Sequence, residues 1–75
     1  MATIEVLSEV TGNVWKIQAS VGDRLDADDD IMILESMKME IPIEAPASGK
    51  LVELRVAEED AVDEDQVVAI IETDN

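Results

Sequence analysis

The 75-residue sequence predicts one all-β domain over residues 1–75, a small sandwich or flattened barrel with an internal repeat. Three observations predict this fold class. Short segments alternate between apolar and polar residues, turn signals separate them at spacings of roughly 8 to 12 residues, and the sequence resembles itself at an offset of 37 residues. A chain this short is near the lower size limit for a core that needs no disulfide or metal.

The segments expected to be strands are rich in aliphatic and β-branched residues. They are TIEV (3–6), IMIL (31–34), EIPIEA (40–45), VELRV (52–56) and VVAII (67–71). In 40–45, Ile41, Ile43 and Ala45 share one face. Pro42 on the other face indicates an edge strand, because proline has no amide hydrogen for a neighbour. A helix over 31–41 is the weaker alternative, since the flanking segments are β-rich.

Two further segments have a clear inner face. Ile4 and Val6 are expected to point inward from the first segment, and Val52, Leu54 and Val56 from the fourth. The predicted turns between the strands are Gly12-Asn13, Gly22-Asp23, the acidic run 26–30, APASG (45–49) and Glu59-Asp60.

The repeat is carried by both identical and similar residues. The identical pairs are Gly12 and Gly49, Asp23 and Asp60, Asp26 and Asp63, Asp28 and Asp65, Ile33 and Ile70, and Glu35 and Glu72. The similar apolar pairs include Val14 and Leu51, Leu25 and Val62, and Leu34 and Ile71. Because acidic residues match easily in so acidic a chain, the apolar pairs carry more weight. Two such halves, each of short strands, must close against each other.

Lys38 lies where the first copy passes into the second, and its counterpart is Asn75. An approximate two-fold axis would therefore place this junction at the end of the molecule opposite the termini. Met37 and Met39 flank the lysine, and a two-residue turn there would be strained because neither central residue is Asn or Gly. The alternatives are a lysine that serves only solubility and methionines that face the core.

The composition excludes several kinds of chemistry. The chain has no histidine and no cysteine, which removes zinc sites, thiol catalysis and histidine-based acid and base catalysis. The acidic run 26–30 lacks the glycine and the bidentate glutamate that a calcium-binding EF-hand loop requires, so no metal site is predicted. Trp15 is expected to be a packing residue rather than a ligand-stacking one.

The charge balance limits the partners. With 19 acidic and 5 basic residues the net charge is −14, which argues against nucleic acid and anionic membranes. The N-terminal segment has no positive stretch and no long apolar run, so the expected location is cytoplasmic. The excess of acid indicates a halophilic protein, the alternative being an ordinary acidic carrier surface.

The segment ESMKME (35–40), with GNVWKIQASVGDRLDADDDIMIL before it and IPIEAPASGKLVELRV after it, resembles the biotinyl carrier domains of biotin-dependent carboxylases. The resemblance covers nearly the whole chain. It implies two four-stranded antiparallel sheets with pseudo-two-fold symmetry, biotin on Lys38 at a hairpin tip, and Met37 and Met39 as flanking recognition residues. The departures are Ser36 in place of the commoner alanine, and Asp28, Glu59 and Asp65 at turn positions that are usually glycine.

The resemblance also implies the function. A biotin protein ligase would load Lys38, and the arm would move carboxyl groups from a biotin carboxylase to a carboxyltransferase of an acyl-CoA or 2-oxo-acid carboxylase. The domain itself would be a non-catalytic carrier, a separate subunit or a part of a longer chain. A lipoyl carrier of a 2-oxo-acid dehydrogenase or glycine cleavage complex is the alternative, and an unmodified β-sandwich binding module is a third.

Overall fold

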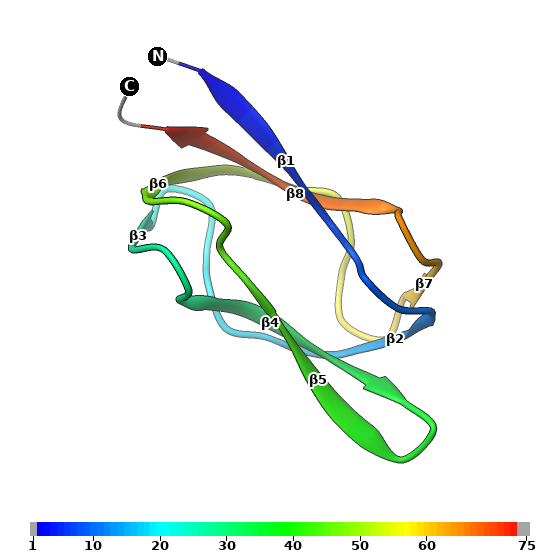
Figure 1. Cartoon of the computed structure of the whole chain (residues 1–75). Helices are drawn as coiled ribbons and strands as arrows, with labels where there is room; N and C mark the ends of the chain where they lie inside the picture. Colours follow the sequence, from blue (N-terminus) through cyan, green and yellow to red (C-terminus); the bar gives the residue numbers. More distant parts are fainter. Residues whose placement is uncertain (1, 74–75) are drawn as a thin grey trace.

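The computed structural model describes residues 2–73, which form eight strands and no helix. The strands are β1 (Thr3–Leu7), β2 (Gly12–Ile17), β3 (Arg24–Leu25), β4 (Asp30–Ser36), β5 (Met39–Glu44), β6 (Gly49–Leu54), β7 (Ala61–Val62) and β8 (Val67–Thr73). Two four-stranded antiparallel sheets face each other, in the orders β1-β8-β6-β3 and β5-β4-β2-β7 (Figure 1). This confirms the predicted all-β sandwich. Within the described residues no helix is long and apolar enough to cross a membrane.

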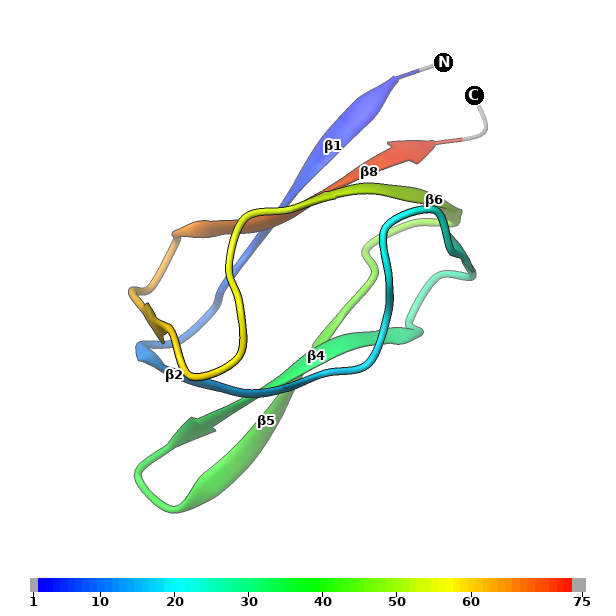
Figure 2. The same ribbon diagram turned by 180° about the vertical axis from the view of Figure 1, so that it is seen from behind.

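The internal repeat determines the topology. A shift of 37 residues carries β2 onto β6, β3 onto β7 and β4 onto β8 with identical bounds, and it carries β1 onto most of β5. Each sheet contains two strands from each half, so neither half forms a sheet alone. The view from behind shows the two halves wrapped around each other, each crossing between the sheets (Figure 2). The prediction that the halves must close on one another is confirmed.

The turns repeat as well. In four turns a side chain accepts a hydrogen bond from the backbone amide three residues earlier: Ser20 to Asp23, Asp26 to Asp29, Ala57 to Asp60, and Asp63 to Gln66, at 2.8 to 2.9 Å. The first and third turns are 37 residues apart, as are the second and fourth. The matched Asp23 and Asp60 each hold a turn, so the low weight placed on acidic matches was wrong for this pair.

Aliphatic side chains from both sheets fill the core. The largest that are almost completely buried are Ile31, Met32, Leu34, Leu51 and Ile71. The helical alternative for 31–41 is wrong, since this segment forms β4, the turn after it and the start of β5. Pro42 does lie on an edge strand, as predicted, because β5 is the outermost strand of its sheet.

Two details of the sequence prediction are wrong. Gly12 and Asn13 do not form a turn but open β2. Val52 does not point into the core, because the pairing of β6 with β8 shifts between Leu51 and Glu53 and makes Val52 the extra residue of a bulge. Leu51 is the buried residue instead. Trp15, which is expected to be a packing residue, has half of its surface exposed.

Candidate functional site

The candidate site is the hairpin that joins β4 to β5. Ser36 pairs with Met39, so the loop consists of Met37 and Lys38 alone. Both have positive φ, 51° and 66°, which is the backbone of the two-residue turn that matches the twist of its strands. The loop is thus the tight turn for which strain is expected, and not a longer loop that would avoid it. Its left-handed backbone costs about 1–3 kcal/mol per residue for side chains other than glycine and asparagine.

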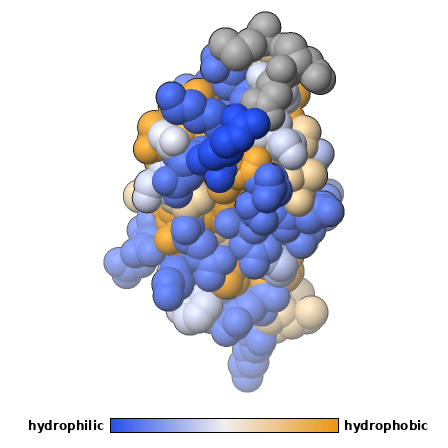
Figure 3. All heavy atoms as spheres, turned by 90° about the vertical axis from the view of Figure 1, so that its left-hand side faces the viewer, coloured by the Kyte–Doolittle hydropathy of each residue, from blue (hydrophilic) through white to orange (hydrophobic). Residues whose placement is uncertain are grey.

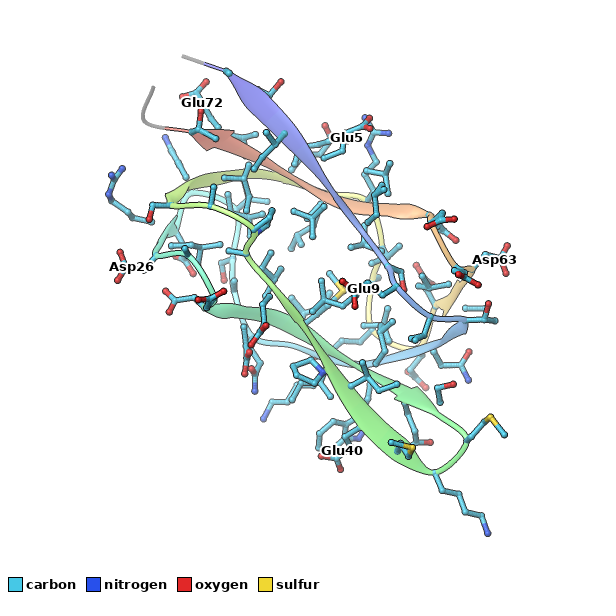
Figure 4. The ribbon with its side chains drawn as sticks, in the orientation of Figure 1. Glu5, Glu9, Asp26, Glu40, Asp63 and Glu72 are labelled. Carbon is cyan, nitrogen blue, oxygen red and sulfur yellow. The ribbon has the colours of Figure 1, made fainter. Side chains whose placement is uncertain are left out.

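The turn exposes all three residues of the predicted Met-Lys-Met site. Met37 is 92% exposed and Met39 is 63% exposed, so the alternative that they pack in the core is wrong. Lys38 is exposed between them, and within residues 2–73 its amine has no hydrogen-bond or ion-pair partner. In Figure 4 the hairpin projects beyond the body of the domain. The amine can therefore approach the active site of another protein.

Polar contacts at the base of the hairpin fix its position. The Ser36 hydroxyl donates to the Thr11 carbonyl at 2.8 Å, and the Thr11 hydroxyl accepts from the Glu64 amide at 3.2 Å. These bonds connect the hairpin to the loops before β2 and before β8. Ser36 is thus more than a small replacement for alanine, because alanine could not make the first bond.

Gly12 completes this base. A Cβ at Gly12 would lie 2.7 Å from the Glu35 carbonyl oxygen, so only glycine lets β2 approach β4 this closely. Sequence reasoning missed both Thr11 and the role of Gly12. The match of Gly12 with Gly49 was the available signal, because Gly49 meets the Glu72 carbonyl oxygen in the same way in the other half.

Carboxylates surround the site without forming a metal centre. Glu35 and Glu40 stand directly opposite each other on β4 and β5 below the turn. Their like charges repel, and this repulsion destabilises the pairing of the two strands there. The labelled carboxylates in Figure 4 are spread over separate strands and loops. Within residues 2–73 no group of three carboxylates is placed to hold a metal ion. Hydrophilic residues cover most of the face seen in Figure 3, as the composition requires.

A groove of about 220 Å³ runs between the end of β1 and β5. Its lining includes Leu7, Val10, Ile41 and Pro42 together with carboxylates such as Glu9. Carboxylates are the only ionisable groups in the lining, and no nucleophile and base pair there. The site chemistry therefore rests on the amine of the hairpin.

Comparison with known proteins agrees with this geometry. The family model described as Biotin-requiring enzyme matches residues 2–74. A urea amidolyase of Saccharomyces cerevisiae is 46% identical over 68 residues, which are 91% of this chain and 4% of that protein. A biotin/lipoyl attachment protein of Bacillus subtilis is 43% identical over 60 residues, which are 80% of this chain and 82% of that protein. The chain thus spans a small part of the first relative and most of the second.

Solved structures share the fold. The crystal structure of the Kluyveromyces lactis urea carboxylase superposes with a TM-score of 0.89 at 37% identity, over 95% of this chain and 6% of that one. A single-chain, multi-domain long-chain acyl-CoA carboxylase superposes with a TM-score of 0.87 over 96% of this chain and 7% of that one, at 23% identity, which shows the fold alone. The chain belongs to the Biotin-requiring enzyme family, and it is a biotin carrier domain of the kind found in biotin-dependent carboxylases.

Proposed function

We propose that Lys38 is the residue that carries biotin. The observation that supports this most directly is an unpartnered, exposed amine at the tip of a two-residue turn, held between two exposed methionines. A lysine side chain provides a flexible stem of four methylenes that ends in one nucleophilic nitrogen. The protruding turn fits an amide-linked group, because neither neighbouring strand nor loop crowds the tip.

Loading would use the residues of the hairpin in defined ways. A biotin protein ligase would convert the carboxyl group of biotin with ATP into an acyl-adenylate, with release of pyrophosphate. The Lys38 nitrogen, after losing a proton, would attack the acyl carbon and form the amide as AMP leaves. Met37 and Met39 offer soft, adaptable apolar contacts to the ligase and to later partners. The bond from Ser36 to Thr11 keeps the turn projecting while these contacts form.

The carrier role follows from tethering. Biotin, when attached, supplies the ureido nitrogen that holds a carboxyl group. The domain keeps this group at an effective concentration on the order of mM near each partner site. We propose that the partners are a biotin carboxylase and a carboxyltransferase, either as separate subunits or in one longer chain, and that the carrier works in the cytoplasm.

The acceptor of the carboxyl group belongs to the carboxyltransferase rather than to this domain. Acyl-CoA and 2-oxo-acid acceptors were predicted from the resemblance, and the urea amidolyase of Saccharomyces cerevisiae adds urea as a third class. We retain the carboxylase role over the lipoyl role because the matched family is that of biotin-requiring enzymes.

Intact-mass measurement tests the site. After incubation with biotin protein ligase, ATP and biotin, the wild-type chain should gain the mass of one biotinyl group, and Lys38→Arg should gain nothing. Lys50→Arg is the matched control, because Lys50 is exposed in the other half of the repeat and should not affect loading. A biotinyl group on Lys38→Arg, or a chain loaded only by a lipoate ligase with lipoate, would overturn the assignment.

A further inference from the structure

Trp15 is the only aromatic residue of the chain, and it lies on the outer surface of a sheet. The pairing of β2 with β4 passes from Val14 and Leu34 directly to Lys16 and Ile33, so Trp15 is the extra residue of a bulge. Val14 is buried, whereas Trp15 and Lys16 are both exposed. The bulge therefore turns the largest side chain of the protein out toward solvent.

Other apolar side chains adjoin Trp15 on this outer surface. Ile33 pairs with Lys16 on one side and with Pro42 on the other, so the three lie in one row across β2, β4 and β5. Pro42 is exposed and Ile33 is half-buried. We call this surface the Trp15 face. Its members are Asn13, Trp15, Lys16, Ile33, Glu35, Glu40, Pro42 and Glu59.

The repeat shows that folding does not require this tryptophan. The equivalent of Trp15 in the other half is Val52, which is the extra residue of the equivalent bulge on β6. The equivalents of Ile33 and Pro42 are Ile70 and Glu5, which pair in the same manner. The same backbone thus forms with valine and glutamate in place of tryptophan and proline, and packing alone does not account for Trp15.

The edge of the Trp15 face is acidic. Glu35 and Glu59 line a shallow hollow together with Trp15, and Glu40 stands opposite Glu35 on the same surface. Lys16 supplies the one positive charge among the members of this face. The face also adjoins the hairpin, since Glu35 is three residues before Lys38. A protein that receives the arm of Lys38 is therefore brought close to Trp15.

We propose that the Trp15 face is the docking surface for the biotin carboxylase, which meets it with a basic surface that has an apolar hollow for the indole ring. This inference rests on the proposed function. Biotin carboxylase chemistry consumes ATP and bicarbonate, both anions, so the mouth of its active site needs positive potential that complements the acidic rim. An exposed tryptophan with an apolar surround is the side chain most typical of an interface hot spot, and an arginine can stack on it.

Nuclear magnetic resonance can test the docking directly, because a chain with one tryptophan gives one indole signal. The experiment titrates the isotopically labelled, biotinylated chain with unlabelled biotin carboxylase from the same organism. The indole signal of Trp15 and the amides of Lys16 and Ile33 should shift or broaden. The amides of Val52 and Ile70 should stay unchanged. Shifts confined to residues 36–39, or centred on Val52, would overturn the proposal.

Kinetics give a second test. Trp15→Ala should raise the KM of the carboxylase for the biotinylated chain by about 30-fold, as expected for loss of an interface hot spot, with little change in kcat. Val52→Ala is the matched control and should leave KM unchanged. An equal KM for Trp15→Ala and the wild type would overturn the docking surface. The proposed function is judged separately, because the mass of the loaded chain shows whether Lys38 was biotinylated in each variant.

Discussion

Replacing Glu59 with glycine should stabilise the domain, because Glu59 holds a backbone conformation that favours glycine. Glu59 has a φ of 76° and stands third in the turn that begins at Ala57. Its counterpart in the other half, Gly22, has a φ of 102° in the equivalent turn. A left-handed backbone costs about 1–2 kcal/mol for a residue with a Cβ. Glycine also gives the unfolded chain more conformational freedom, and this lowers the stability of the folded domain by about 0.4–1 kcal/mol.

The net gain for Glu59→Gly is therefore about 0.5–1 kcal/mol. With a slope of about 1 kcal/mol per molar urea for a small domain, the unfolding midpoint should rise by about 0.5–1 M. Urea unfolding followed by circular dichroism measures this change. Glu59→Gln is the control, since it removes the charge and keeps the Cβ. If Glu59→Gln gives the whole increase, or if Glu59→Gly gives none, the argument from backbone strain is refuted.

Three further predictions concern the close approach, the charge and the hairpin. Gly49→Ala should lower the free energy of unfolding of the domain by about 3 kcal/mol, because the new Cβ would strike the Glu72 carbonyl oxygen and the side chain of Ile71. An unchanged midpoint of urea unfolding would contradict this. The melting temperature should rise by several degrees between about 0.1 M and 1 M KCl, since the Debye length falls from about 10 Å to about 3 Å over that range. A melting temperature independent of KCl would remove the halophilic interpretation. Ser36→Ala should lower the free energy of unfolding by about 1 kcal/mol, because it removes the hydrogen bond to the Thr11 carbonyl. It should also speed the exchange of the backbone amides in residues 36–39 without preventing biotinylation. Unchanged amide exchange would show that this bond does not hold the hairpin.

The sequence predicted the fold class and the tip residues because both depend on local patterns. The alternation in 40–45 survives in β5 and the residue after it, since Ile43 and Ala45 are buried and Pro42 lies on an edge strand. The place of Lys38 at one end of the molecule follows from its position at the repeat junction, whereas the length of the turn there was left open by the sequence. Asn75, the counterpart of Lys38, lies outside the described residues, so the symmetry at that point stays a prediction.

The error about which residue of β6 faces the core comes from a bulge, which a strict alternation cannot represent. Val52 is the extra residue of the bulge, and each residue after it lies on the opposite face from the one that an unbroken alternation starting at Leu51 would give. Leu51, and not Val52, therefore points inward. A bulge in β2 likewise places Trp15, the expected packing residue, on the outer surface with half of it exposed. Contacts between distant segments could not be predicted from the sequence either. The hydrogen bond from Ser36 to Thr11, for example, depends on how the two sheets close.

The topology, in which each sheet takes two strands from each half, explains why Lys38 lies where it does. The pair β4 and β5 has its equivalent in β8 and β1, with Glu35 opposite Glu40 in the first and Glu72 opposite Thr3 in the second. The first pair is closed by the turn that carries Lys38, and the second is open because its strands lead to the chain ends. Figure 1 shows these two ends on opposite sides of the domain. A chain that continued from the start of β1 or the end of β8 would therefore leave at the far end, and an arm attached to Lys38, as proposed, would be free to enter an active site.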